Sequence, residues 1–147
     1  MSFDLAIWVG DRPASDQEAR RTFDRLTAEV EREIPEGIAP KPDPRLAKCV
    51  REITGSYSDG LLGLIFGSVW TSMPVTPHGS IVYMNLAWGV KTKVLDFIAR
   101  TAAKHGLVCY DPQTSRVVDP ANLAALHESI AHSQAAFDDV VRSLRGK

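Results

Sequence analysis

The sequence predicts a single α+β domain, a ferredoxin-like split βαβ sandwich whose antiparallel sheet carries two main helices on one face. Three observations predict it. Segments that alternate apolar and polar residues are interleaved with segments whose apolar residues recur every three or four positions. Hydrophobic residues make up 44% of the chain and charged residues 24%, which is typical of a globular protein. The length of 147 residues fits one domain, with 1–118 as the core and 119–147 as a C-terminal helix.

Residues 3–9, FDLAIWV, alternate with a period of two and are predicted to form the first strand. The first main helix is predicted over residues 15–34. Ser15 and Glu18 have the spacing of a capping box at its start, and Pro35 limits its continuation. Its apolar stripe consists of Ala19, Phe23, Leu26, Val30 and Ile34.

Residues 44–54 are predicted to form an extra helix. Asp43 suits its N-cap and Pro44 its first position. Cys49 falls on the apolar face, so we expect a buried structural thiol there. The other residues of this face are Leu46, Val50 and Ile53.

Two more strands and the second main helix are predicted in the middle of the chain. Residues 68–88, SVWTSMPVTPHGSIVYMNLAW, read as a hairpin because Pro77, His78 and Gly79 separate two β-rich runs. The second main helix is predicted over residues 90–105, with Gly106 as its cap. Residues 107–110 then form a strand that an Asp-Pro turn ends.

The C-terminal helix is predicted to begin at Asp119 and Pro120, as N-cap and first position. The main helices leave the second face of the sheet without cover, so we expect the C-terminal helix to cover it. That face would hold Trp8, Tyr83, Asn85 and Cys109. The apolar stripe of the C-terminal helix consists of Leu123, Leu126, Ile130, Phe137, Val141 and Leu144.

Composition argues against several classes of partner. A net charge of −1 lacks the positive excess that nucleic-acid binding usually uses. Residues 60–90 contain no charged residue, but glycines and prolines break this stretch into pieces too short to span a membrane. Two cysteines sixty positions apart and the absence of a signal-peptide pattern indicate a reducing cytoplasm.

The candidate chemical groups form no catalytic or metal-binding pattern. Cys109 has His105 as its nearest histidine in sequence, but a histidine in the last turn of a helix more simply interacts with the helix dipole. No Cys-x-x-Cys or His-x-x-x-His spacing occurs, and the glycines at 60, 63 and 67 lack the lysine of a phosphate loop. The sequence therefore predicts no cofactor and no enzymatic activity. The alternative is a small enzyme with a site near residues 60–77 that uses Cys109 or His78.

Three segments carry a family resemblance: SFDLAIWVGDRPASDQEA, HGSIVYMNLAW and HGLVCYDPQTSRV. They resemble a group of small uncharacterised bacterial α/β proteins, some of them immunity proteins that neutralise polymorphic toxins of competing bacteria. The resemblance extends over residues 3–118, and its most specific motif is LVCYDPQ. It implies a cognate protein toxin as the partner and no catalytic residue.

These observations together predict a non-enzymatic binding protein, an immunity protein that occludes a toxin. Residues 1–37 hold nine acidic and five basic side chains, which gives the first helix an acidic face. A face of this kind is also what a solvated helix shows, and a homodimeric ligand-binding domain is a third alternative. The predicted partner-binding residues are Asp24, Glu29, Glu33, Trp70 and His78.

Overall fold

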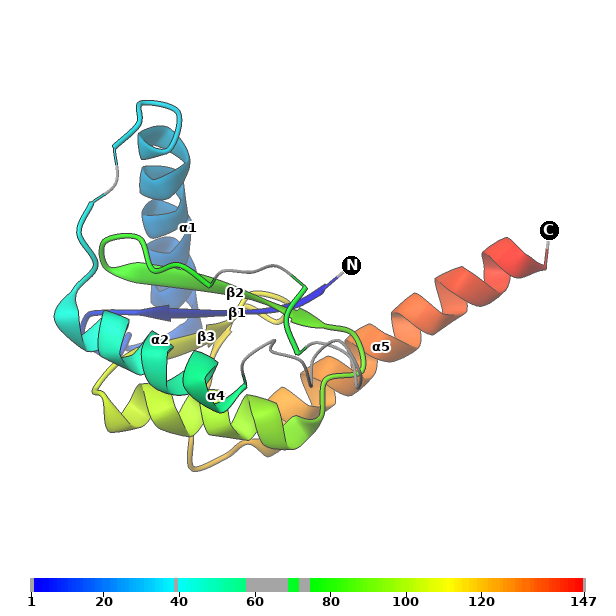
Figure 1. Ribbon diagram of the computed structural model, residues 1–147. Coiled ribbons are helices and arrows are strands. Elements are labelled where there is room, and N and C mark those ends of the chain that lie inside the picture. The colour runs from blue at the N-terminus through cyan, green and yellow to red at the C-terminus, as the bar shows by residue number, and fades with distance from the viewer. Residues whose placement is uncertain (1, 39, 58–68, 72–74, 147) are drawn as a thin grey trace.

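The protein is an α+β structure built on an open antiparallel sheet (Figure 1). The computed structural model describes the chain except for residues 1, 39, 58–68, 72–74 and 147. In the described part the sheet has four strands in the order β2-β1-β3-β4, and all neighbours are antiparallel. The strands are β1 (Ser2–Trp8), β2 (Ile81–Ala87), β3 (Val108–Asp111) and β4 (Arg116–Val117). The first and last predicted strands, at 3–9 and 107–110, are confirmed within one residue.

Four helices of the described part accompany the sheet, and the ends of the first three follow the sequence signals closely. They are α1 (Asp16–Glu33), α2 (Pro44–Ser56), α4 (Thr92–Lys104) and α5 (Ala124–Arg145). At the start of α1, the Glu18 backbone N–H donates to Ser15 Oγ at 3.1 Å, and the Glu18 carboxylate accepts from the Ala14 N–H. At α2 the Asp43 carboxylate accepts from the Arg45 N–H at 2.9 Å. Gly106, with φ of +69°, ends α4 as predicted.

One face of the sheet is covered by α2 and α4, which pack side by side. Alternate strand residues supply its centre, and the helices add apolar residues spaced at helical period. The helix at 44–54 is therefore one of the two main helices of this face, not an extra one. The largest fully buried residues of this core are Phe3, Leu5, Ile7, Leu46, Ile53, Val82, Met84, Leu86, Leu95 and Ile98.

The opposite face is covered by α1, so the prediction that the C-terminal helix covers it is wrong. Ala19 and Leu26 of α1 pack on Trp8 and Tyr110 in a second apolar cluster. The other four residues of the predicted stripe belong to this cluster, whereas Ile34 is exposed, and periodicity does not indicate which face of a sheet a stripe meets. Cys109 belongs to the first face, because strand residues alternate and its neighbour Tyr110 points to α1.

The helix α5 packs on the core only through its first half. Leu123, Leu126 and Ile130 are buried in the cluster under α2 and α4. The predicted start at Asp119 is wrong, because its carboxylate accepts from the Ala121 N–H and closes a turn before the helix begins. The rest of α5 extends beyond the body of the protein to the C-terminus (Figure 1).

The predicted hairpin is described only in part. Residues 69–71 run antiparallel along the outer edge of β2, where the Thr71 N–H donates to the Asn85 carbonyl and the Ala87 N–H to the Val69 carbonyl. Most of the segment 60–77, the predicted site of the alternative enzyme, lies outside the described residues. None of the described helices is long and apolar enough to cross a membrane.

Candidate functional site

An open groove lies between α1 and the edge of the sheet that β2 forms. Its volume is about 400 Å³, within the range of about 300–1,000 Å³ that is usual for ligand sites. We call it the α1 groove. Its lining residues are Phe23, Thr27, Val30, Glu31, Thr76, His78, Ile81 and Tyr83.

The floor of the α1 groove is aromatic and aliphatic because α1 covers the sheet incompletely. Phe23 packs between two tyrosines, with ring centroids 5.0 Å from Tyr110 and 6.1 Å from Tyr83. Tyr110 is fully buried, whereas Tyr83 stays 41% exposed. An aromatic ring that is packed on one side and open on the other is a common anchor of binding sites.

Tyr83 is held in place by a polar cluster that it forms with Asn85 of its own strand and Asp4 of the adjacent strand β1. Its hydroxyl donates to Asp4 Oδ2 at 3.0 Å, and the Asn85 amide donates to Asp4 Oδ1 at 2.8 Å. Burial, and then the charge of the Asp4 carboxylate, raise the pKa of Tyr83 above its usual value. The tyrosine is therefore a neutral hydrogen-bond donor at physiological pH.

The other end of the groove is acidic and contains a histidine. His78 Nε2 lies 3.1 Å from Glu33 Oε2, and both side chains are mostly buried. Gly79, with φ of +61°, gives the turn before β2 its shape, and its carbonyl accepts from the Asp43 N–H. A smaller hollow of about 130 Å³ continues past His78 and brings in Glu29.

The α1 groove and the smaller hollow together bring three of the five predicted partner-binding residues close to one another: His78 lines both, and Glu29 and Glu33 line the hollow. Asp24 is an exposed residue of α1 that pairs with Arg20 at 3.3 Å. Trp70 is only 3% exposed, and its indole N–H donates to the Tyr57 carbonyl. Its burial places it in the core, which corrects the expectation of a surface anchor.

Sequence analysis missed Phe23, Glu31 and Tyr83 as groove residues. Phe23 was assigned to a core stripe, and Tyr83 to a face expected under the C-terminal helix. The signal that could have located them is the strand register, which puts Tyr83 opposite Ala6 on the face that α1 covers. The sequence did not indicate that α1 packs on this face of the sheet, and without that information Phe23 and Tyr83 could not be placed together.

The two cysteines are unsuited to catalysis. Both are free and buried, at 0% exposure for Cys49 and 4% for Cys109. Burial raises the pKa of Cys49 to about 11 and that of Cys109 to about 12, so both remain protonated thiols. His105 lies 2.7 Å from a Glu52 carboxylate oxygen, which gives this histidine a partner other than a cysteine.

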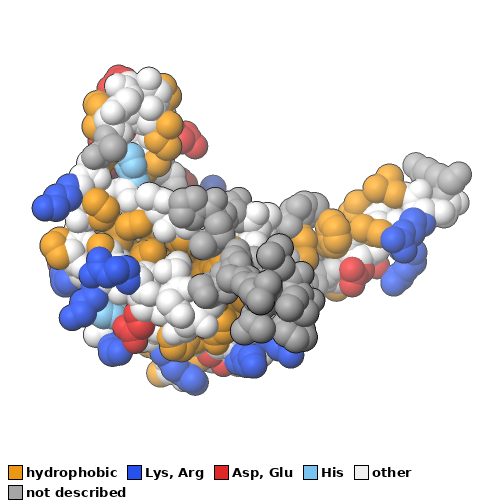
Figure 2. Space-filling view, in the orientation of Figure 1, with side chains coloured by type: hydrophobic (Ala, Val, Ile, Leu, Met, Phe, Trp, Pro, Cys, Tyr) orange, Lys and Arg blue, Asp and Glu red, His pale blue; other side chains and the backbone are white. Residues whose placement is uncertain are grey.

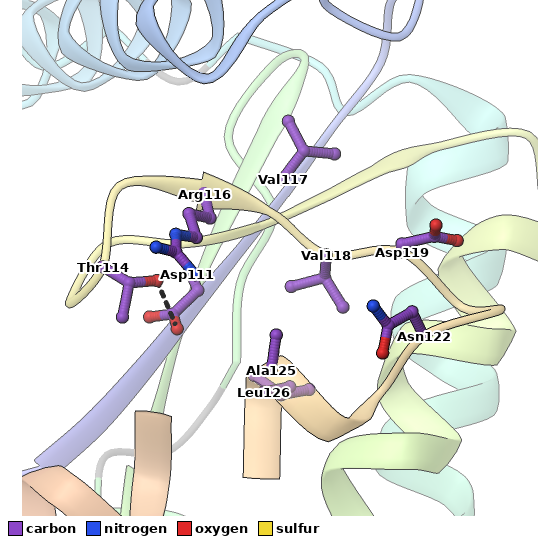
Figure 3. Close-up of a pocket in the computed structure, with 9 residues that line it drawn as sticks. All are labelled: Asp111, Thr114, Arg116, Val117, Val118, Asp119, Asn122, Ala125 and Leu126. Atoms are coloured by element: carbon purple, nitrogen blue, oxygen red, sulfur yellow. Dashed lines mark hydrogen bonds between the residues drawn. The ribbon is translucent and has the colours of Figure 1, made fainter. Parts of the chain in front are cut away.

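A second cavity, of about 110 Å³, lies between the β3–β4 turn and the start of α5 (Figure 3). It has room for only a few water molecules at about 30 Å³ each. The Asp111 carboxylate beside it is already used, because it accepts from the Gln113 N–H, the Gln113 amide and the Thr114 hydroxyl. Gln113 in turn bonds both backbone groups of Asp4. The LVCYDPQ motif thus supplies a structural link between β3 and β1.

Within the described residues, no group of three His, Cys, Asp or Glu side chains is arranged to hold a metal ion. The hydroxyl of Thr27 in the α1 groove donates to the Phe23 carbonyl of its own helix. The groove thus offers an apolar floor, a fixed tyrosine and an acidic end, an arrangement suited to binding.

No family model matches the chain, and no curated protein or solved structure matches it significantly.

Proposed function

We propose that the chain is a non-enzymatic binding protein, an immunity protein that neutralises a cognate bacterial toxin by occlusion, with the α1 groove as its contact surface. The observation that carries the proposal is the open apolar floor beside an acidic end. Energetic anchors of interfaces are aromatic and apolar pockets, while charges of one sign speed the encounter with a partner of the other sign. The partner that fits is a basic protein surface with an apolar side chain at its centre.

The surface around the groove supports a protein partner over a small ligand. Ile34 and Ile38, just past the end of α1, are 62% and 46% exposed. Figure 2 shows hydrophobic side chains next to acidic ones on the protruding part of α1. An apolar patch that continues beyond a groove and has a charged rim is typical of an interaction surface.

Glu31 provides the clearest test of the electrostatic part. Glu29 pairs with Arg25, and Glu33 lies against His78, so reversing either charge would also break a local contact. Glu31 lines the groove, is exposed, and has no ion pair among the described residues. Glu31→Lys should therefore slow association with the proposed toxin partner about three- to tenfold at low salt.

The matched control is Glu128→Lys, which makes the same charge change at an exposed position of α5, away from the groove. It should leave the association rate within about twofold. Equal rates for both variants and the native protein, at low and at high salt, would refute electrostatic steering by the groove.

The enzyme alternative relies on His78 or Cys109. The pair of His78 and Glu33 has the geometry of a general base, which is why it needs its own test. Toxin protection that survives in both His78→Ala and Cys109→Ala would support occlusion. Protection lost in His78→Ala, with binding of the toxin retained, would support an enzymatic role.

The finer fold and the compartment are also proposals. The order 69–71, β2, β1, β3, with α2 and α4 on one face, fits a ferredoxin-like core in which α1 is the addition. Two free, buried cysteines fit a cytoplasmic location.

A further inference from the structure

The second half of α5 is an arm that leaves the body of the protein. We define the arm as residues 132–145, which extend past the sheet and the other helices (Figure 1). Just before the arm, α5 is fixed to α4, because His127 Nε2 lies 2.6 Å from Asp96 Oδ1. In the arm, Val140 is 55% exposed and Leu144 is 69% exposed. The arm thus carries large apolar side chains into solvent, and Figure 2 shows that hydrophobic side chains gather along one edge of it.

The apolar stripe of α5 runs along its whole length, with spacings of three, four and seven residues. Such a spacing is the heptad pattern of helices that pack against another helix. Its first three residues are buried in the protein's own core, and its last three are half-buried or exposed. The positions are Leu123, Leu126, Ile130, Phe137, Val141 and Leu144.

A helix of this kind needs a partner to be stable. Isolated helices shorter than about 12–15 residues are marginal in water, because most helical stability in proteins comes from packing an apolar face. The described contact of the arm with the body is Phe137, whose ring stacks on Trp88 at 5.4 Å. Val140 and Leu144 lie farther along the arm, and both side chains are exposed.

The charges beside the stripe indicate what the partner is. At about 100° per residue, Asp138 and Arg145 lie on the same edge of the stripe, about two turns apart. Neither has an ion pair among the described residues, whereas Arg142 and Asp139, farther from the stripe, bond each other at 3.4 Å. This edge is therefore acidic nearer the body and basic near the C-terminus.

We propose that the arms of two copies of this chain pack side by side in an antiparallel, twofold-symmetric pair. The symmetry axis lies beside Val141, so Asp138 of each copy faces Arg145 of the other. Leu144 of one copy then lies between Phe137 and Val140 of the second. In a parallel pair the edge that carries Asp138 and Arg145 would lie on opposite sides of the interface in the two copies, so these charges can meet only in the antiparallel arrangement.

The oligomeric state in solution tests the proposal. The interface is short, so we expect a dimer with a Kd of about 10–100 µM, measurable by sedimentation equilibrium between about 5 and 300 µM protein. Leu144→Asp should weaken the dimer at least about tenfold. Ala135→Asp, which adds the same charge on the outer side of the arm, should leave it intact. Thermal unfolding of both variants should match that of the native protein, since neither residue is part of the core.

A charge swap distinguishes a second copy from any other partner. Asp138→Arg alone and Arg145→Asp alone should each weaken the dimer about three- to tenfold at low salt, because each sets like charges together. The double variant, Asp138→Arg with Arg145→Asp, should restore it. A native protein that stays monomeric up to about 300 µM, or a double variant as weak as the single ones, would overturn the proposal.

Disulfide trapping gives an independent readout. Val141→Cys places one thiol beside the symmetry axis, and mild air oxidation should link two copies through it. Glu128→Cys, on a surface of α5 outside the arm, should link far less under the same conditions. The native cysteines are buried and do not interfere. Equal linkage of the two variants would contradict the pairing of the arms.

Discussion

The two faces of the sheet are covered to different degrees. Against α2 and α4, strand residues such as Leu5 and Met84 are completely buried, and the helices close over the full width of the face. Against α1, Trp8 and Tyr110 are buried, but Tyr83 on the neighbouring strand is 41% exposed. One helix cannot cover a face that two helices cover on the other side.

We call the face under α2 and α4 the closed face and the face under α1 the open face. We expect the closed face to determine stability and the open face to determine binding. The closed face consists of apolar residues, so it contributes the transfer free energy that stabilises the fold. The open face keeps a polar cluster of Asp4, Tyr83 and Asn85 within reach of solvent, beside an apolar groove. We therefore expect substitutions on the closed face to change the free energy of unfolding, and those on the open face to change binding.

The largest loss of stability is expected on the closed face. Leu95 of α4 is fully buried between the sheet and α2. Leu95→Ala removes its contacts and leaves a cavity, so it should lower the free energy of unfolding by about 2–5 kcal/mol. Urea denaturation measures this directly. A cost below about 1 kcal/mol would show that the closed face is loosely packed.

A smaller loss is expected at the turn that links β3 to β1. Asp111 is 3% exposed and accepts three hydrogen bonds from Gln113 and Thr114. Asp111→Ala leaves these donors unsatisfied and should cost about 2–3 kcal/mol. Asp111→Asn, which keeps part of the acceptor set, should cost less. Equal costs in urea denaturation would mean that the hydrogen bonds do not determine the effect.

The sequence predicts the local structure of this protein better than its packing. The start of α1 at Ser15 and the end of α4 at Gly106 follow from short-range chemistry, namely a side-chain cap and a left-handed turn. The Asp-Pro signal at Asp119 gave a wrong helix start because the same side-chain bond also closes a simple turn. Local signals therefore determine the type of each element and some helix ends. Other helix ends, such as the start of α5, depend on tertiary contacts.

The candidate site required information that the sequence does not contain locally. His78 and Glu33 were both selected for their chemistry, but their contact at 3.1 Å depends on how α1 crosses the sheet. Trp70 looked like a surface anchor in an uncharged stretch, and its burial against Tyr57 became clear only in three dimensions. Long-range contacts of this kind depend on the choice of face, which periodicity alone does not give.

The buried thiols of the closed face should make stability depend on pH in the alkaline range. In the unfolded chain a thiol ionises near a pKa of about 8.5, whereas burial raises the pKa of Cys49 to about 11 and that of Cys109 to about 12. Above pH of about 9 the unfolded chain thus binds fewer protons than the native protein, so the free energy of unfolding falls by up to about 1.4 kcal/mol per pH unit and thiol.

Urea denaturation at pH values between about 8 and 10, a range around the thiol pKa of the unfolded chain, measures how steeply the free energy of unfolding falls with pH. The control is the double variant Cys49→Ala with Cys109→Ala, whose stability should lack the thiol contribution. A thiol reagent at neutral pH should label neither cysteine in the native protein and both in urea. Rapid labelling of the native protein would show that the closed face opens readily.

The smallest effect on stability, with the largest effect on binding, is expected at Tyr83. Tyr83→Ala removes a half-exposed ring and one hydrogen bond to Asp4, so it should cost no more than about 1.5 kcal/mol of stability. Tyr83→Phe, which keeps the ring and loses only the hydroxyl, is the matched control.

Calorimetric titration of the proposed toxin partner into these two variants measures most directly whether the open face is the binding face. If the α1 groove is the contact surface, Tyr83→Ala weakens the affinity at least about tenfold, while Tyr83→Phe stays within about threefold of the native protein, with native-like unfolding curves for both. A native Kd for Tyr83→Ala would contradict the assignment of binding to the α1 groove.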